Sequence, residues 1–232
     1  MSEPLVRLND VTFAYAEHLP VLCGCSLTLR SGEKVGLIGP NGSGKTTLLA
    51  LMVGLLFPTA GTVEVLGKVR RRAADFDEIL GRVGLLFQDS DDQLFCPTVA
   101  EDVAFGPFNQ GKTRDEVRRI VRRTLDSLGL AGMENRITYR LSGGEKRMVA
   151  LAAVLAMEPD VLLLDEPTAG LDERAVKRVR DAVLRLPQAM LIVSHDRAFL
   201  ESTVDRMVEL REGRIVPVDC PTDEPEQSIP LQ

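Results

Sequence analysis

A glycine-rich loop separates a short apolar run from a leucine-rich segment, and few folds accommodate this arrangement. The run is Lys34 to Ile38, the segment Thr46 to Gly54 is predicted to be helical, and the loop is Gly39-Pro40-Asn41-Gly42-Ser43-Gly44-Lys45-Thr46. Glycines in such a loop let backbone N–H groups turn toward phosphate oxygens, and the helix N-terminus adds positive potential. The order of strand, loop and helix therefore favours a nucleotide site over a glycine turn without a ligand.

Three residues at the end of the loop carry the expected chemistry. Lys45 would reach the terminal phosphates, and the Thr46 hydroxyl would ligate Mg²⁺. Thr47 is expected to contact the nucleotide as well. The predicted ligands are ATP and Mg²⁺.

The composition fits a globular protein of one domain. The 232 residues are 44% hydrophobic and 27% charged, and the formal net charge is -6. An acidic balance argues against a nucleic-acid partner, because phosphate affinity depends on clustered Lys and Arg. No run approaches the roughly 18 apolar residues of a membrane span, and no signal-peptide pattern opens the chain. Four cysteines without a Cys-x-x-Cys pair and two histidines predict reduced thiols and no transition-metal cluster.

Strand patterns occupy the N-terminal part of the chain. Alternating apolar residues over the first 30 positions predict antiparallel strands with turns near Asn9-Asp10 and His18 to Pro20. Gly61 to Leu66 and Val83 to Phe87 are further predicted strands. After them the strand pattern stops, and the capping box Thr113-x-x-Glu116 precedes apolar residues at helical spacing. Residues 89–157 are therefore expected to form a helical subdomain.

Two aliphatic runs near the C-terminus are typical of central strands in a parallel sheet. They are Val161 to Leu164 and Ala189 to Val193, and Glu173 to Leu186 is predicted to be their crossover helix. Met207 to Val216 is predicted to be a hairpin that turns at Glu212-Gly213. We expect an α/β fold within residues 1–219. It combines a P-loop NTPase core with a mainly parallel sheet (1–88 and 158–219), an N-terminal antiparallel β-subdomain and the inserted α-helical subdomain, and it is followed by a mobile acidic tail, 220–232.

Two carboxylates follow the first of these runs. Asp165 and Glu166 come directly after Leu164, and a buried parallel strand directs its last residues to the edge of the sheet where ligands bind. Asp165 is expected to hold Mg²⁺ through water, and Glu166 to polarise the attacking water as general base. Without other motifs, two carboxylates after an aliphatic run could equally serve as a helix cap. The glycine-rich loop favours the catalytic interpretation.

A second glycine pair precedes another predicted helix. Leu141-Ser142-Gly143-Gly144-Glu145 leads into a segment with apolar residues at helical spacing. A bare helix N-terminus suits an anion, although Ser-Gly-Gly before a helix is often only a cap. Together with the loop, it predicts two phosphate-binding helix ends in one chain.

The order of these motifs resembles that of the ATP-binding cassette (ABC) family of ATPases, over about residues 5 to 216. The resemblance implies that Tyr15 stacks on adenine and that Gln88 senses Mg²⁺ and the γ-phosphate. It also implies that Asp172 lies at a dimer contact and that His195 is a γ-phosphate switch. Simple surface packing of Tyr15 and a buried structural role for His195 are the alternatives.

The same resemblance implies a second subunit. Two cassettes of this family face head to tail, so Ser142 to Glu145 of one would complete the ATP site built on Lys45 of the other, in a homodimer. Glu145 and Lys146 stand where many members of the family have Gln. The glycines and the helix start are unchanged by this departure.

The stretch from Phe87 to Pro107 and the signature that begins Leu-Ser-Gly-Gly-Glu-Lys are similar to those of energy-coupling factor importers, particularly the cobalt and nickel group. This implies a peripheral ATPase on the cytoplasmic face of the membrane, with a membrane coupling subunit near residues 89–107. A substrate-binding membrane subunit would be contacted only indirectly. Ser194 to Leu200 is similar to the translation-factor branch. A soluble ribosome-acting or DNA-associated ATPase, disfavoured by the acidic charge, and a regulator without turnover, disfavoured by Glu166, are the other hypotheses.

Overall fold

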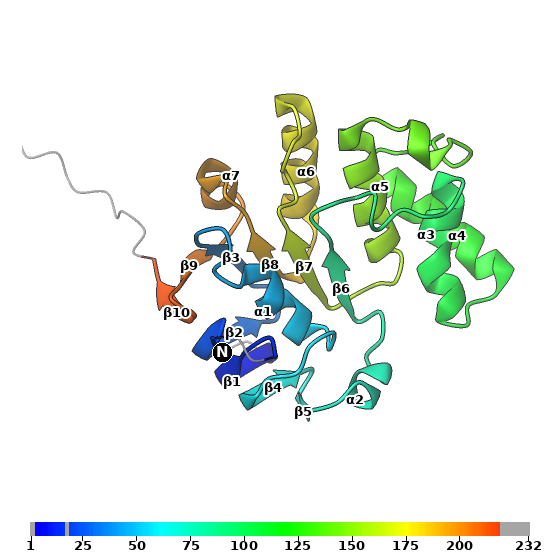
Figure 1. The fold of residues 1–232 in the computed structure, drawn as a ribbon. Coiled ribbons are helices and arrows are strands. Elements are labelled where there is room, and N and C mark those ends of the chain that lie inside the picture. Colours follow the sequence, from blue (N-terminus) through cyan, green and yellow to red (C-terminus); the bar gives the residue numbers. More distant parts are fainter. Residues whose placement is uncertain (1–2, 17–18, 219–232) are drawn as a thin grey trace, which may run out of the picture.

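The larger of two β-sheets contains the strands that were expected to be parallel. In a computed structural model, described for residues 3–16 and 19–218, its strand order is β10-β9-β3-β8-β7-β6 (Figure 1). β9, β3, β8, β7 and β6 run parallel, and β10 pairs antiparallel with β9 at the edge. The bounds are β3 Lys34–Ile38, β6 Val83–Leu86, β7 Val161–Asp165, β8 Ala189–Val193, β9 Arg206–Arg211 and β10 Arg214–Pro217.

The smaller sheet is antiparallel, with the order β2-β1-β4-β5. Its strands are β1 Pro4–Phe13, β2 Leu22–Arg30, β4 Ala60–Val65 and β5 Lys68–Arg70. The turn predicted near Asn9-Asp10 is wrong, because β1 continues through this pair. Asp10 has a φ of 48° and the register shifts between Leu8 and Val11, which is a β-bulge, and polar residues that adopt positive φ occur in bulges as well as turns. The second expected turn includes His18, which lies outside the described residues.

The parallel sheet is buried between two layers. Alternate residues of β7 enter different cores. Val161 and Leu163 pack with the antiparallel sheet and α1 (Lys45–Met52). Leu162 and Leu164 pack with α5 (Gly143–Leu155) and α6 (Glu173–Arg185). Burial on both faces explains the continuous aliphatic sequence of this strand, and the predicted fold class is confirmed.

Helices make up most of the segment between β6 and β7. α3 (Val99–Asn109), α4 (Arg114–Ser127) and the short 3₁₀ helix η1 (Thr138–Arg140) precede α5, and α3 and α4 lie beyond α5 on the side away from the parallel sheet (Figure 1). The capping box predicted at Thr113 and Glu116 is confirmed. The shorter helices α2 (Ala74–Asp77) and α7 (Arg197–Glu201) complete the described helices. The division of the chain at residues 89 and 157 stays a prediction, and the expected mobile tail, 220–232, lies outside the described residues.

Candidate ATP site

The glycine-rich loop connects β3 to α1 and packs against β9. A Cβ atom at Gly39, where φ is 152°, would lie 2.5 Å from the carbonyl oxygen of Leu210, so only glycine fits this contact. Lys45 is buried, and its Nζ donates hydrogen bonds to the carbonyl oxygens of Gly39 at 2.8 Å and Pro40 at 3.0 Å. The hydroxyl of Ser43 is buried without a hydrogen-bond partner among the described residues. The loop thus contains the cation of Lys45 and, at Ser43, a hydroxyl that is free to donate a hydrogen bond to a ligand.

Asp165 lies at the end of β7, against the first turn of α1. The Thr46 hydroxyl donates a hydrogen bond to Asp165 Oδ2 at 2.8 Å. Burial raises the pKa of Asp165, although the Thr46 hydrogen bond and then the charges of Lys45 and Arg147 oppose this. Burial also lowers the pKa of Lys45, against the charges of Glu166 and Asp165. Burial and the pairing of opposite charges therefore act in opposite directions on both pKa values.

Glu166 is held in an uncommon backbone conformation beside His195. Its φ is 47°, in the left-handed region that costs free energy for a residue with a side chain. Its Oε2 accepts a hydrogen bond from the backbone N–H of His195 at 3.2 Å, and its Oε1 lies 3.4 Å from His195 Nε2. The imidazole is half exposed while the carboxylate is almost buried. The strain and these contacts fix the carboxylate at the mouth of the sheet.

The loop, the carboxylates and His195 line one cavity of about 850 Å³, a size suited to a nucleotide. Tyr15 is at this cavity too, where its hydroxyl is 3.0 Å from Thr47 Oγ1 and its ring packs edge-on against Phe13. The predicted residues found in the lining are Tyr15, Asn41, Gly42, Gly44, Lys45, Thr46, Thr47, Gln88, Asp165, Glu166 and His195. The structure brings them together from segments far apart in the sequence.

The residues present fit a magnesium ion. Mg²⁺ prefers oxygen ligands and retains waters. The hydroxyl of Thr46, the carboxylate of Asp165 and the side-chain amide of Gln88 are oxygen donors from three segments, and all three residues line the same cavity. The unpaired Ser43 hydroxyl and the loop N–H groups suit the phosphate oxygens of the nucleotide.

The second predicted phosphate-binding end lies elsewhere. Ser142 and Glu145 are not among the residues that line the Lys45 cavity, and Gly143 lines a neighbouring cavity of about 720 Å³ together with Gln88 and Asp165. The prediction of a bare N-terminus at α5 is wrong, because Glu145 accepts hydrogen bonds from the Ser142 N–H at 2.9 Å and the Ser142 hydroxyl at 3.0 Å. The sequence contained this capping box, Ser142-x-x-Glu145.

The start of α5 lies next to the start of α6. A Cβ atom at Gly144 would approach the Cβ of Ala175 to 2.7 Å, so glycine allows the two helices to meet here. Asp172 caps α6 by accepting a hydrogen bond from the Ala175 N–H at 2.8 Å. Ser142 and Asp172, both expected at a subunit contact, therefore belong to adjacent helix ends.

The contribution of Glu145 to the free energy of unfolding is predicted to depend on pH. Its pKa is lowered, first by the hydrogen bond from the Ser142 N–H and also by its contact with Arg136. A lowered folded-state pKa stabilises the protein above the ordinary pKa of Glu and loses that effect as the pH falls through the lowered value. We expect Glu145→Gln to reduce the unfolding free energy by about 0.5 kcal/mol at pH 7, as for other exposed charged contacts. Urea unfolding at decreasing pH should show this difference vanish, and a constant difference would contradict it.

Arg147 is a buried residue that the sequence analysis missed. It lies in α5, only 4% exposed, and its guanidinium donates to the carbonyl oxygen of Phe87 at 2.6 Å and to that of Gln88. Burial lowers its pKa, against the charges of Asp89, Asp165 and Glu166. The signal that could have identified it is an arginine directly before the apolar run 148–157, in the segment predicted to be helical after Ser142. Arg147 attaches α5 to the segment that carries Gln88.

The strand-loop-helix phosphate site and the two carboxylates at the adjacent strand end define a P-loop ATPase. A model of the ABC transporter family matches residues 22–169, and the chain belongs to that family. It is an ATPase that binds ATP and Mg²⁺, as ATP-binding subunits of ABC transporters do.

Three relatives show the similarity in detail. A putative ABC transporter ATP-binding protein of Brucella suis is 49% identical over 215 residues, which cover 93% of this chain and 89% of that protein. The energy-coupling factor transporter ATP-binding protein EcfA of Methanothermobacter thermautotrophicus is 40% identical, with 94% and 72% covered. The structure of CbiO1 from Clostridium perfringens, part of the ABC transporter complex CbiONQ, has a TM-score of 0.85 and 32% identity, with 93% and 88% covered. Within the described residues, no helix is both long and apolar enough to cross a membrane.

Proposed function

We propose that this chain is the energy-coupling ATPase of an importer of the energy-coupling factor type, with cobalt or nickel ions as cargo. The observation that carries its ATPase role is the cluster of Lys45, Thr46, Asp165 and Glu166 in one cavity. The importer role is supported by the similarity to EcfA and to CbiO1 and by the sequence from Phe87 to Pro107. Peripheral attachment to the cytoplasmic face of a membrane is part of the proposal.

Seven residues of the cavity and the loop N–H groups have proposed tasks. Lys45 and the loop N–H groups bind the phosphates, Tyr15 contacts the adenine, and Thr46, Gln88 and Asp165 hold Mg²⁺. The ion supplies neutralisation of phosphate charge when bound. Glu166 accepts a proton from water as the water oxygen bonds to the γ-phosphorus, the bond to the bridging oxygen breaks, and ADP leaves. The half-exposed His195, whose N–H donates a hydrogen bond to Glu166, contacts the γ-phosphate in this proposal.

A head-to-tail homodimer is proposed to complete the site. Within one chain, none of the residues 142–145 lines the Lys45 cavity, and Gly143 lines only the neighbouring cavity. The adjacent starts of α5 and α6 form one exposed surface that a second copy can contact. In this arrangement the helix N-terminus of one subunit would add its positive potential to the γ-phosphate bound by the other.

Ser142→Arg tests this dimer. The long cation would occupy the surface at the start of α5, so we expect nucleotide binding by the monomer to be retained and ATP-dependent dimerisation to be lost. Size-exclusion chromatography of a hydrolysis-blocked protein with ATP and Mg²⁺ measures the result. Arg178→Glu, an exposed change farther along α6, serves as the control. A Ser142→Arg protein that still dimerises would contradict the proposed contact.

The membrane coupling region is proposed to include residues 89–107. Its framework is fixed by Asp102, which is buried and accepts hydrogen bonds from the N–H groups of Phe95 and Cys96 at 3.1 and 3.0 Å, and from the Thr138 hydroxyl at 3.1 Å. Phe95 and Phe105 stack edge-on at the surface, with ring centroids 4.7 Å apart. Asp102 thus acts inside the protein, and the exposed rings are the groups available to a membrane subunit.

Isolation of the chain from detergent-solubilised membranes of its own cells tests the importer role. We expect membrane subunits to co-purify, and cells without the chain to take up less radiolabelled cobalt or nickel. Recovery with ribosomes instead would contradict the importer and favour the translation-factor alternative. Co-purification with unchanged uptake of both ions would contradict only the cargo.

A further inference from the structure

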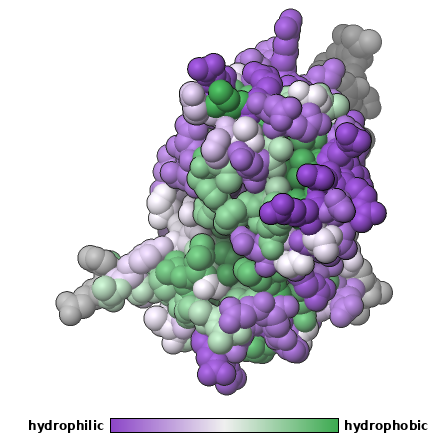
Figure 2. Space-filling model, turned by 90° about the vertical axis from the view of Figure 1, so that its right-hand side faces the viewer, coloured by the Kyte–Doolittle hydropathy of each residue, from purple (hydrophilic) through white to green (hydrophobic). Residues whose placement is uncertain are grey.

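A side chain covers part of the open edge of the parallel sheet. Among the described strands, β6 is outermost at this edge (Figure 1), and the same side of the molecule exposes an apolar area bordered by hydrophilic residues (Figure 2). The side-chain amide of Gln93 accepts a hydrogen bond from the Phe87 N–H and donates one to the carbonyl oxygen of Leu85, both at 3.3 Å. Two backbone groups at a strand edge, which are usually left unpaired, therefore have a partner.

The amide of Gln93 takes the place of one residue of a neighbouring parallel strand. In a parallel ladder, such a residue donates its N–H to a carbonyl group and accepts a hydrogen bond from the N–H two positions further along. Leu85 and Phe87 have this separation, and a carboxamide has a donor and an acceptor side by side. An aliphatic or carboxylate side chain at position 93 would lack the donor. The contact therefore requires an amide.

Both backbone groups of Phe87 are held by side chains. Its N–H donates to Gln93, and its carbonyl oxygen accepts from Arg147 at 2.6 Å. Arg147 also donates to the carbonyl oxygen of Gln88. The chain then turns back, because the Gln93 N–H donates to the carbonyl oxygen of Ser90 at 3.2 Å. The short loop that begins at Gln88 is therefore closed at its base.

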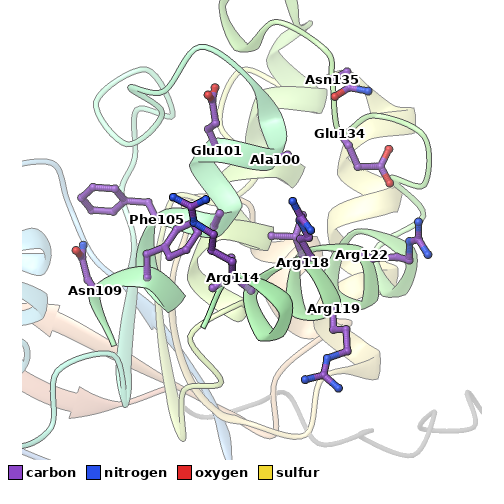
Figure 3. Close-up of a pocket in the computed structure, with 14 residues that line it drawn as sticks. Ala100, Glu101, Phe105, Asn109, Arg114, Arg118, Arg119, Arg122, Glu134 and Asn135 are labelled. Atoms are coloured by element: carbon purple, nitrogen blue, oxygen red, sulfur yellow. The ribbon is translucent and has the colours of Figure 1, made fainter. Parts of the chain in front are cut away.

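Gln93 does not line the ATP cavity. It lines a smaller cavity of about 310 Å³ with Phe105 and Asn109. These two residues also line the groove of about 1220 Å³ between α3 and α4 (Figure 3). Gln88, in contrast, lines the ATP cavity and its neighbour. An effect of Gln93 on the nucleotide site must therefore act through the loop that carries Gln88.

We propose that Gln93 is a positioning residue for Mg²⁺. Its amide fixes Phe87 at the end of β6 and thereby sets the direction in which Gln88 leaves the sheet toward the ATP cavity. Gln93 does not contact the ion. This role rests on the proposed function of Gln88 as a magnesium ligand. It gives the second glutamine of the stretch Phe87 to Phe95 a task within the chain, independent of any membrane subunit.

Hydrogen exchange in the nucleotide-free chain, followed by NMR, tests the contact. Gln93→Met keeps the length of the side chain but has no amide. The Phe87 N–H loses its acceptor and should exchange about fivefold faster, the effect of one hydrogen bond. The matched control is Gln110→Met, which removes a hydrogen bond to the carbonyl oxygen of Met157 at 3.1 Å and should leave the Phe87 rate unchanged. An unchanged Phe87 rate in the Gln93→Met protein would overturn the proposal.

The Mg²⁺ requirement of ATP turnover tests the positioning. Gln93→Met should raise the Mg²⁺ concentration for half-maximal turnover about tenfold, as for other residues that orient a metal ligand. Saturating Mg²⁺ should restore most of the turnover. A variant that is only less stable would turn over less ATP at every Mg²⁺ concentration and keep the same half-maximal concentration, and this result would overturn the proposal.

Gln88→Met separates a failure of this role from a failure of the proposed function. If Gln88→Met raises the Mg²⁺ requirement and Gln93→Met does not, only the role of Gln93 is wrong. If neither variant raises it, the magnesium role of Gln88 is wrong, and the role of Gln93 is wrong with it.

Discussion

Replacement of Glu166 by Gln is expected to lower ATP turnover at least about 100-fold, the usual contribution of a general base, while nucleotide binding is retained. Glutamine keeps the size of the side chain, and its amide oxygen can still accept the hydrogen bond from the His195 N–H, which Glu166 accepts at 3.2 Å. The group lost is the carboxylate that takes the proton from water. Phosphate release and fluorescent-nucleotide binding, measured on the same preparation, separate the two effects.

The control for this change is Glu201→Gln. Glu201 is an exposed carboxylate in α7 whose contact is with Arg197 at the surface. The Glu201→Gln protein should hydrolyse ATP at the rate of the unmodified protein. Turnover by Glu166→Gln within a few-fold of normal would mean that another group takes the proton, and the proposed role of Glu166 would be wrong.

Arg147→Met should separate α5 from the segment that carries Gln88. Methionine fills similar space but donates no hydrogen bond, so the carbonyl groups of Phe87 and Gln88 lose their partner. Loss of the partner of a partly buried carbonyl costs about 1 kcal/mol, and because two carbonyl groups are affected we expect an unfolding free energy about 2 kcal/mol lower. If Gln88 helps to hold Mg²⁺, turnover should fall about tenfold and half-maximal activity should require more Mg²⁺.

The dependence on Mg²⁺ distinguishes positioning from simple loss of stability. A variant that is only less stable would keep the normal Mg²⁺ dependence at temperatures where it is folded, and that outcome would contradict the role of Arg147. Arg147→Lys, which can still donate to one carbonyl, should recover part of the activity. Arg178→Met, at an exposed position in α6, should match the unmodified protein in both measurements.

The sequence predicted most of the fold because its strands and caps are local signals. β3 and β8 have the predicted bounds, and the hairpin turns at Glu212-Gly213 as expected. The Asn9-Asp10 pair misled the prediction because a positive φ at a polar residue serves a bulge as well as a turn. Whether β1 ends or continues there depends on its pairing with β2 and β4, which are distant in the sequence.

The candidate site was predictable where one motif carries the chemistry, as in the loop and in Asp165-Glu166. Contacts between motifs could not be predicted in the same way. The role of Arg147 depends on the distance from α5 to the end of β6, and the separation of Ser142 from Lys45 depends on how the helices pack on the sheet. The capping role of Glu145 could be predicted from the local spacing Ser142-x-x-Glu145, whereas the adjacent glycines also fit an anion site.

The contact between Gly39 and Leu210 has a consequence for biosynthesis. The loop is synthesised well before β9, on which it rests, and β3 pairs with both β8 and β9. A nascent chain that stops before residue 206 lacks this support for its phosphate loop. ATP binding should therefore begin only after β9 has been synthesised, so that shorter nascent chains would not sequester nucleotide.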